Sequence, residues 1–585
     1  MKKNPINNFF QNFSLLLVSV LLFILANPNF INNKGFGFLA WFYYIPLLFL
    51  IHKASIKSVW LYGGLFGLLF YSGYAYWLVN YGLECLIFIC CLYFVEYNFL
   101  FLFLKYIDKK SIIYNWLLLW LVISAFEFIK TKGFLGFNYG VTVYTQWRYI
   151  PLIQICDFVG PFYLNSFIIF CSCIVYSFIV KISEKTKYLK FKENNLELNQ
   201  YNSHLNYLSE HKNKMKHFSL MLNSFILIVY IVSFVFILVY GLNIKIKENN
   251  EYITISAIQQ NENPDDEGID SQINNFKTLH ELTNTALEMN ENIDIIVWPE
   301  TAIVPSITYK YYRLSNGPVP DSNEEKSINF VVNVLNYINR KNEMFVIGNN
   351  GIVFEKFGNP EDSKSETIYS YTNDALVFEG GKNVIPPVPQ IYSKIKLVPF
   401  SESFPYKNIF PKLYKQLEKM YGYLYTSGSD YKVFKLNNFY FSTPICFEDT
   451  FPEVARNMYK AGARCLINLT NDSWSKSISC QYQHLSMAVF RSIENRIPTV
   501  RSATSGITCV ISEKGEVTQS VAAFTPGFIT SKINVIEKNR KPTFYCQYGI
   551  LLEYLLLVFT GALLLIQIIT DIIKYIKGKH YGKKR

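Results

Sequence analysis

Long apolar runs separated by short polar segments fill the chain from its start to about residue 245, and one more lies near its end. Most of these runs reach the ~17–25 residues that a helix needs to cross a membrane. The pattern predicts eight spans, at Phe10–Ala26, Gly37–Ile51, Val59–Val79, Leu83–Leu104, Ile113–Ile129, Phe162–Ile182, Phe218–Leu242 and Ile550–Tyr575. We therefore expect a polytopic α-helical membrane protein.

Two of these runs allow a second interpretation. Gly37–Ile51 is short, so it also fits an interfacial or tilted helix. Phe10–Ala26 follows Met1-Lys2-Lys3 and ends in small and polar residues, which is also typical of a signal peptide. The distribution of charge favours a retained anchor over a signal peptide.

Short apolar runs and amphipathic helices alternate between Asn243 and Arg540, as in a water-soluble α/β domain with a mixed sheet. The predicted strands are Tyr252–Gln260, Ile293–Trp298, Met344–Ile352, Ala375–Phe378, Phe439–Ile445, Cys465–Thr470 and two final strands within Thr499–Ser512. The predicted helices are Ile269–Met289, Ile328–Arg340, Pro452–Ala461 and Gln481–Asn495. The expected domains are residues 1–242 (seven spans), 243–540 (the α/β domain) and 541–585 (the last span and a basic tail).

The net charge of +12 is compatible with nucleic-acid binding, but its placement argues against it. Basic residues cluster where apolar segments end and in the tail, as the positive-inside rule predicts for cytoplasmic segments. The residues expected in the cytoplasm are Lys2, Lys3, Lys53, Lys57, Lys105, Lys109, Lys110, the lysines from Lys181 to Lys216, Lys574, Lys577, Lys579, Lys583, Lys584 and Arg585. The short outside loops hold Lys34, Lys130, Lys132 and Arg148. With the N-terminus inside, residues 243–540 are expected outside the cytoplasm.

Two loops differ from the other connections. Ser183–His217 is rich in Lys, Glu and Asn, which indicates a solvated linker or an amphipathic helix without chemistry. Thr131–Gly160 combines glycine with aromatic residues, which fits a re-entrant loop or an aromatic belt equally well.

A cysteine, Cys446, stands where a predicted strand turns into a helix. Helix N–H groups stabilise a thiolate there, although a lone cysteine on a strand is more often a packing residue. His280 and His484 are the histidines expected on the same side of the membrane, so a Cys-His pair is open but unsupported. Glu300, which ends a predicted strand, is an alternative base.

A third stretch carries two lysines and a carboxylate. Lys394 and Lys396 lie two apart in an apolar strand, so we expect both to point to one face. Glu402 closes the stretch. A lysine near a thiolate lowers the pKa of the thiol and can bind an oxyanion.

These stretches resemble known motifs in their order and setting. They are WPET at Trp298–Thr301, YSKIKLVPFSE at Tyr392–Glu402 and ICFED at Ile445–Asp449. They resemble the nitrilase superfamily, whose triad is Glu-Lys-Cys, and with the predicted membrane topology the chain resembles the apolipoprotein N-acyltransferase family. The resemblance covers nearly the whole length and includes Asn471–Trp474, Gln483-His484 with Arg491 and Glu494, and Arg501 before Gly506–Thr508.

The resemblance implies the role of each site residue. Glu300 would be the general base, Lys394 would stabilise the oxyanion, and Cys446 would be the nucleophile. Lys394 is favoured over Lys396 because it follows Tyr392-Ser393 at the family's position.

The resemblance also marks supporting residues and departures from the family. Glu402 would orient Lys394, and Glu448 matches the glutamate after the nucleophile. Phe447 stands where the family often has tyrosine, so a hydroxyl is missing beside Cys446. Ser475 departs from the Phe-Gly that commonly follows the tryptophan, so the loop at the mouth of the site is expected to differ.

The implied fold of the soluble domain is an αββα sandwich, and the implied location is the bacterial inner membrane with this domain on the periplasmic side. The implied reaction moves an acyl chain from a membrane phospholipid to the N-terminal amine of a diacylated lipoprotein, without metal or organic cofactor. We expect Cys446 to be a free thiol and assign no disulfide. Two alternatives stay open: a membrane-tethered amidase or nitrilase that uses water, and a non-enzymatic protein with a degenerate binding domain.

Overall fold

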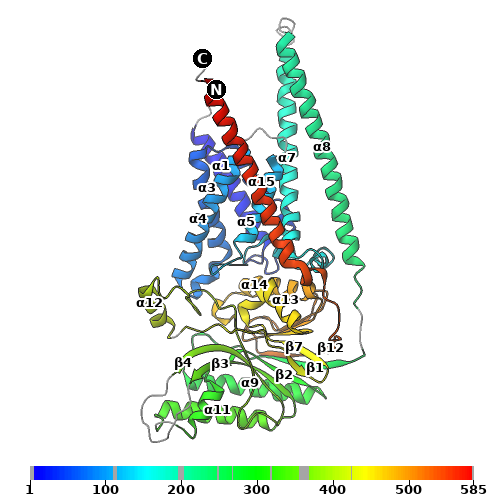
Figure 1. The fold of residues 1–585 in the computed structure, drawn as a ribbon. Coiled ribbons are helices and arrows are strands. Elements are labelled where there is room, and N and C mark those ends of the chain that lie inside the picture. Colours follow the sequence, from blue (N-terminus) through cyan, green and yellow to red (C-terminus); the bar gives the residue numbers. More distant parts are fainter. Residues whose placement is uncertain are drawn as a thin grey trace. The chain divides into compact units, whose positions relative to one another are not determined.

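The computed structural model describes residues 5–109, 115–194, 203–246, 250–266, 268–316, 319–354, 368–422 and 424–582. The chain divides into two compact units (Figure 1). Unit 1 comprises Met1–Ile155, Val159–Ile244 and Tyr548–Arg585, and unit 2 comprises Cys156–Phe158 and Lys245–Gln547.

Unit 1 is helical. Its elements are α1 (Pro5–Ala26), η1 (Gly37–Trp41), α2 (Tyr44–Lys53), α3 (Ile56–Tyr74), η2 (Tyr76–Asn80), α4 (Leu83–Asp108), α5 (Asn115–Ile129), η3 (Thr142–Gln146), α6 (Ile150–Ile153), η4 (Gln154–Asp157), α7 (Pro161–Asn194), α8 (Ser203–Leu242) and α15 (Phe544–Gly582). The last two residues of η4 and the first four residues of α15 are assigned to unit 2.

Five of the described helices are long and apolar enough to cross a membrane, which fits a membrane protein. Their apolar stretches are Asn8–Ala26, Leu83–Asp108, Pro161–Ser183, Met221–Leu242 and Phe544–Lys574. Gly37–Lys53 and Asn115–Ile129 are shorter apolar helical stretches. The count of eight spans therefore remains a prediction.

Glycines on α3 allow close packing against α4. A Cβ atom on Gly63 would lie 2.5 Å from the Tyr97 carbonyl oxygen, and one on Gly67 would lie 2.3 Å from the Tyr93 carbonyl oxygen. Small residues let membrane helices approach in this way, since lipid supplies no hydrophobic force between them.

The Gly- and aromatic-rich loop Thr131–Gly160 is folded over the end of α5. Lys130 Nζ lies 2.7 Å from Glu127 Oε1, and both side chains are fully buried. The Thr142 N–H donates to Glu127 Oε2 at 3.2 Å, so this ion pair fixes the start of η3.

The described parts of the polar segment Ser183–His217 are helical, at the end of α7 and the start of α8. Residues 195–202 of this segment lie outside the described residues, as do Lys2, Lys3, Lys110, Lys583, Lys584 and Arg585 of the predicted charge pattern.

Unit 2 contains two six-stranded sheets, in the orders β12-β1-β2-β3-β4-β5 and β11-β10-β9-β8-β7-β6. The strands are β1 (Tyr252–Gln259), β2 (Ile295–Ile303), β3 (Met344–Phe354), β4 (Ile368–Phe378), β5 (Gln390–Ser393), β6 (Phe434–Leu436), β7 (Phe439–Ser442), β8 (Cys465–Thr470), β9 (Thr499–Ala503), β10 (Cys509–Ile511), β11 (Val517–Ser520) and β12 (Gly527–Asn534). The helices are α9 (Ile269–Met289), α10 (Ile307–Arg313), α11 (Ser322–Asn339), α12 (Pro411–Tyr421), α13 (Pro452–Ala461) and α14 (Ile478–Asn495), with short turns η6 (Cys446–Thr450) and η7 (Ser473–Ser475).

The two sheets face each other between two helical layers. Figure 1 shows α9 and α11 on one side of the sheets and α13 and α14 on the other. Ser502 Oγ on β9 donates to the Ile258 carbonyl oxygen on β1 at 2.8 Å, which joins the sheets directly. The αββα sandwich expected for this domain is confirmed.

Several elements of unit 2 were not predicted from the sequence, among them α10, α12 and β6. The strands within Thr499–Ser512 are not the final ones, because β11 and β12 follow them. β12 pairs antiparallel with β1, from Tyr252↔Asn534 to Gln259↔Gly527, so the end of the domain closes onto its beginning. Polar residues on these strands hide a hydrophobic alternation that would have marked them.

Candidate active site

Cys446 lies at the start of the η6 turn, four residues after Ser442 at the end of β7 and shortly before α13 begins. Its φ angle is +48°, in the left-handed region that non-glycine residues rarely adopt. Cys446 is partly exposed, whereas the next four residues are buried. A strained backbone that presents one reactive side chain is a common feature of functional sites.

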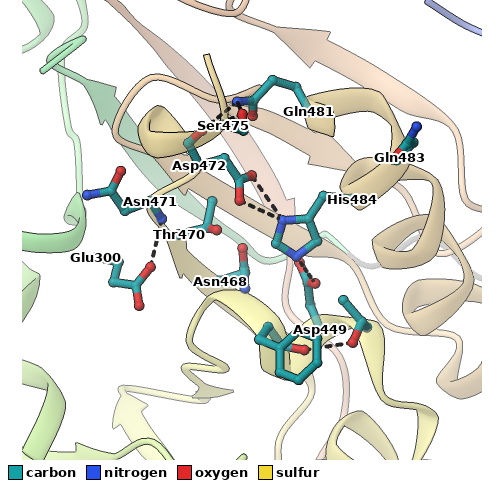
Figure 2. A network of polar contacts seen from close by, with 12 residues as sticks. Glu300, Asp449, Asn468, Thr470, Asn471, Asp472, Ser475, Gln481, Gln483 and His484 are labelled. Atoms are coloured by element: carbon teal, nitrogen blue, oxygen red, sulfur yellow. Dashed lines mark hydrogen bonds and ion pairs between the residues drawn. The ribbon is translucent and has the colours of Figure 1, made fainter. Parts of the chain in front are cut away.

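Glu300 lies on β2, which continues through Pro299 instead of ending before it. Its side chain is buried and accepts hydrogen bonds from three distant segments of the chain. Oε1 lies 2.8 Å from Asn373 Nδ2 and 3.4 Å from Lys394 Nζ. Oε2 accepts from the Asn471 N–H at 2.7 Å, a bond drawn in Figure 2. The carboxylate is therefore held by three different segments of the chain.

Burial raises the pKa of the Glu300 carboxyl group, and the Glu402 carboxylate raises it further. The Lys394 charge and hydrogen bonds from Asn373 and Cys446 oppose this shift. The net effect is a raised pKa, which makes Glu300 a better proton acceptor than an ordinary surface glutamate.

Lys394 is fully buried and follows the last residue of β5. Its Nζ lies 2.7 Å from Glu402 Oε1 and 3.4 Å from Glu300 Oε1. Burial alone would lower the pKa of Lys394, but Glu402, Glu300 and Cys446 outweigh it and the pKa is raised. The ammonium is thus a fixed positive charge beside the thiol.

The expectation that Lys394 and Lys396 share one strand face is wrong. β5 ends at Ser393, so strand alternation does not apply to either lysine. The Lys396 side chain is 41% exposed and lies 3.9 Å from Glu453. The structure brings only Lys394 to Glu300 and Glu402.

Burial raises the pKa of the Cys446 thiol well above its usual value, and the Glu300 charge adds to this, while Lys394 lowers it. The resting group is therefore a neutral thiol beside a carboxylate. Removal of the proton by Glu300 would leave a thiolate that Lys394 stabilises. The arrangement suits formation of a covalent bond to sulfur.

Glu448 joins the nucleophile turn to the segment that carries Lys394. Its two carboxylate oxygens lie 2.8 and 2.9 Å from the Tyr392 hydroxyl. The same carboxylate accepts from the N–H groups of Ile395 at 2.8 Å, Lys396 at 3.1 Å and Ile445 at 2.8 Å. It is fully buried, so these bonds replace its hydration.

Glu402 and Phe447 complete the predicted set. Glu402 Oε2 accepts from the Val398 N–H at 2.7 Å, which aims Oε1 at Lys394. The Phe447 ring is buried and packs edge-on against Phe451, with the centroids 4.8 Å apart. The phenylalanine thus keeps the packing that an aromatic ring provides beside Cys446.

Sequence reasoning missed Asn373. It lies on β4, and its Nδ2 bridges Glu300 Oε1 at 2.8 Å and Glu402 Oε1 at 3.4 Å. No local pattern marks this asparagine, because its role depends on two residues that are distant in sequence.

His484 is buried and lies within a group of charged side chains. Figure 2 shows its ring between Asp472 and Asp449. Nε2 lies 2.7 Å from Asp449 Oδ1, and Nδ1 lies 2.9 Å from Asp472 Oδ1. His280, the other candidate, lies on α9 and stacks near the Tyr337 ring.

The residues that the structure describes include no group of three or more His, Cys, Asp or Glu side chains able to hold a metal ion. None of the eleven cysteines, all of which lie in the described residues, forms a disulfide in the structure.

Two family models match the chain. Residues 254–538 match carbon-nitrogen hydrolase, and residues 19–174 match the apolipoprotein N-acyltransferase N-terminal domain. These matches fall on the α/β unit and on the helical unit respectively.

Three relatives match over nearly their whole length. Apolipoprotein N-acyltransferase 1 of Treponema denticola is 32% identical over 550 residues, 94% of either chain. Apolipoprotein N-acyltransferase 1 of Treponema pallidum is 34% identical over 540 residues, 90% of either chain. Apolipoprotein N-acyltransferase of Borreliella burgdorferi is 27% identical over 552 residues, 92% of this chain and 91% of the relative. With both family models and relatives of this identity and coverage, the chain belongs to the apolipoprotein N-acyltransferase family of the nitrilase superfamily and is an N-acyltransferase.

Proposed function

We propose that the enzyme moves a fatty acyl chain from a membrane phospholipid to the N-terminal α-amino group of a diacylglyceryl-cysteine in apolipoproteins. The observation that carries this proposal is the meeting of Glu300 and Lys394 beside the partly exposed Cys446. The pKa of each of the three groups depends on the other two. Family membership supplies the substrate class.

In the first step, Glu300 takes the proton of Cys446 and the sulfur attacks the ester carbonyl carbon of the phospholipid. Lys394, with a backbone N–H next to Cys446, stabilises the tetrahedral oxyanion. The carbon–oxygen bond of the ester then breaks, Glu300 returns the proton to the leaving oxygen, and lysophospholipid departs. A thioester remains on Cys446.

In the second step, the α-amino group of the lipoprotein attacks the thioester carbonyl carbon. Glu300 takes a proton from the amine, Lys394 again stabilises the oxyanion, and the carbon–sulfur bond breaks. The sulfur is reprotonated and the product carries an amide. A thioester divides one difficult transfer into two easier ones, so we expect ping-pong kinetics.

Supporting roles follow from the contacts. Glu402 and Asn373 hold Lys394 and Glu300 in place through 2.7 and 2.8 Å contacts. Glu448 joins the Lys394 segment to the Cys446 turn. None of these steps requires a metal or organic cofactor.

We propose residues 1–242 as the membrane domain, 243–540 as the catalytic domain outside the cytoplasm, and 541–585 as the last span with a cytoplasmic tail. The basic residues at the ends of the apolar segments support this orientation in the bacterial inner membrane. Both proposed substrates are anchored in the membrane by lipid chains, so the membrane spans would hold the catalytic domain next to them.

Intact-mass analysis after exposure to phospholipid tests the nucleophile. We expect an acyl adduct on the wild type that hydroxylamine removes, and none on Cys446→Ala. An adduct retained in Cys446→Ala would refute the assignment of the nucleophile.

A second assay separates transfer from hydrolysis. The purified protein is given phospholipid and a diacylated lipopeptide, and the products are followed by mass spectrometry. We expect N-acylated peptide. Free fatty acid without N-acylated peptide would support the hydrolase alternative instead.

A further inference from the structure

Four charged side chains form a closed, buried ring close to Cys446. They are Asp449, Asp472, His484 and Arg501, and each is at most 3% exposed. His484 contacts both carboxylates, at 2.7 Å to Asp449 and 2.9 Å to Asp472. Arg501 contacts both as well, through Nη2 to Asp472 at 2.9 Å and through Nη1 to Asp449.

The ring joins the two segments that hold the reacting groups. Asp449 belongs to η6, the turn that begins at Cys446. Asp472 follows Asn471, whose N–H donates to Glu300 Oε2 at 2.7 Å. Figure 2 shows this continuous path from Glu300 through Asn471 and Asp472 to His484 and Asp449. A shift between Asp449 and Asp472 would therefore change the separation of the thiol from Glu300.

The hydrogen-bond geometry favours a charged imidazole. Nδ1 and Nε2 of His484 each face a carboxylate oxygen, and a carboxylate can only accept. A neutral imidazole protonated on Nε2 would accept at Nδ1 from Arg501 Nη2, which lies 3.0 Å away, but its Nδ1 lone pair would also face the two Asp472 oxygens at 2.9 Å. Both nitrogens donate only in the imidazolium form.

Charge balance leads to the same form. The two carboxylates carry two negative charges and Arg501 carries one positive charge, so the ring is neutral only when His484 is protonated. Burial would lower the pKa of His484, but Asp449 and Asp472 raise it to about 9. The negative charge of Asp472 raises the pKa of the Cys446 thiol, so an unbalanced ring would oppose the thiolate.

Two buried thiols that interact with the ring bring no charge. Cys480, on α14, and Cys509, on β10, are buried thiols that interact with Asp472 and Arg501 respectively. Burial raises the pKa of both thiols, so they are neutral at physiological pH.

We propose that His484 is a positioning residue whose imidazolium ties the Cys446 turn to the segment that holds Glu300 and cancels one negative charge close to the thiol. It acts on the reaction through Asp449 and Asp472, without touching substrate. The inference rests on the proposed nucleophilic role of Cys446.

The test measures the rate of Cys446 alkylation by iodoacetamide from pH 7 to 11, in the full-length protein, resolved by peptide mass spectrometry. Because burial raises the pKa of the thiol well above its usual value, the shift of the midpoint is read as the displacement along the pH axis between the rising parts of two rate profiles. We expect His484→Gln to move the midpoint of the rate up by about one pH unit, which is a tenfold lower rate on the acidic side. Adding Asp472→Asn to His484→Gln restores neutrality, and we expect at least half of the shift to be reversed.

Thr450→Val is the matched control. Thr450 is buried, and its hydroxyl donates to the Phe447 carbonyl oxygen at 2.8 Å inside the same turn. The substitution loosens η6 without changing a charge, so we expect the midpoint to stay within ~0.3 pH units, well inside the shift that a full charge produces. A purely structural role of His484 predicts equal shifts in both single variants, and that result would overturn the proposal.

Two measurements keep the inference testable if His484→Gln does not fold. Asp472→Asn alone removes one of the two carboxylates that keep His484 protonated, so by the same charge balance the imidazole loses its proton and the ring stays neutral. We expect its midpoint to stay close to the wild-type value, and a rise of about one pH unit would overturn the proposal. Nitrogen NMR of wild-type protein labelled at histidine should show one imidazole that remains doubly protonated at pH 8, and its absence would also overturn it.

The outcome can be separated from failure of the proposed function. A wild-type enzyme without a Cys446 acyl adduct would refute the reaction, whatever the alkylation midpoints are. A normal acyl adduct, together with alkylation midpoints that do not change when the charge of the ring changes, would refute only the role of His484.

Discussion

At the scale of single residues, burial and the charge of Lys394 shift the pKa values of Cys446 and Glu300 in opposite directions. Cys446 and Glu300 both have raised pKa values because burial penalises their charged forms. Lys394 opposes both shifts, so one fixed ammonium favours the thiolate after proton transfer and the oxyanion that follows. In the proposed mechanism Glu300 is the base, and none of the seven histidines of the chain takes this role.

Glu300→Gln tests the base. Glutamine keeps the size of the side chain and can still accept from the Asn471 N–H, but it cannot take a proton from sulfur. We expect acyl-adduct formation to fall by 10²-fold or more. The adduct is measured by rapid quench and intact mass, and a normal acylation rate would count against the role.

Lys394→Met tests the oxyanion charge, with Lys396→Met as its matched control. Lys394 is fully buried against two carboxylates, whereas the Lys396 side chain is 41% exposed. We expect the first substitution to cost on the order of 10²-fold or more in rate and the second less than threefold.

Both rates are measured under single-turnover conditions at matched protein stability. A small effect of Lys394→Met together with a large effect of Lys396→Met would exchange the two assignments.

At the scale of elements, short connections hold the site together. The segment after β5 and the η6 turn follow strands of different sheets, and Glu448 in the turn links them by accepting from the Tyr392 hydroxyl on β5 and from the N–H groups of Ile395 and Lys396. In the same way, Asn373 on β4 holds the carboxylates that pair with Lys394. Catalytic geometry here depends on the ends of strands, where the backbone leaves the sheet.

Tyr392→Phe tests the Glu448 link. The substitution removes the hydroxyl that lies 2.8 Å from Glu448 Oε1 and keeps the buried ring. We expect about 1 kcal/mol of lost stability and a lower rate of acylation, since the Lys394 segment is less firmly held.

Thermal unfolding and single-turnover acylation measure the two effects. An acylation rate unchanged despite a lower Tm would show that the link is structural only.

At the scale of the whole molecule, an αββα sandwich lies in sequence between helical segments that are apolar enough to cross a membrane. Its stability should depend on pH through the buried ring of charges. The folded-state pKa of His484 is raised to about 9 from an ordinary value of 6.5. A raised pKa stabilises the fold fully below pH 6.5, and this contribution is lost as the pH rises toward about 9.

We therefore expect the Tm of the wild type to fall between pH 6.5 and 9, measured by the fluorescence of unit 2 unfolding. The His484→Gln variant should show a weaker dependence over the same range. Equal slopes in both proteins would contradict the linkage.

Local patterns of the sequence predicted the class of protein and much of its secondary structure. Ile269–Met289, Pro452–Ala461 and Cys465–Thr470 match α9, α13 and β8 at both ends. Such elements depend on hydrophobic spacing within one segment, which the sequence states directly. The motifs around Glu300, Lys394 and Cys446 are likewise short contiguous stretches, so they can be recognised from the sequence alone.

Only the tertiary structure decided which residues meet. Lys394 and Lys396 look equivalent along the chain, and the end of β5 at Ser393 separates their surroundings. Asn373 reaches Glu300 across 73 positions and Asn471 reaches it across 171. His484 gains its charge from Asp449 and Asp472, which come from other elements. Periodicity describes one segment at a time, whereas burial and pairing are set when distant segments pack together.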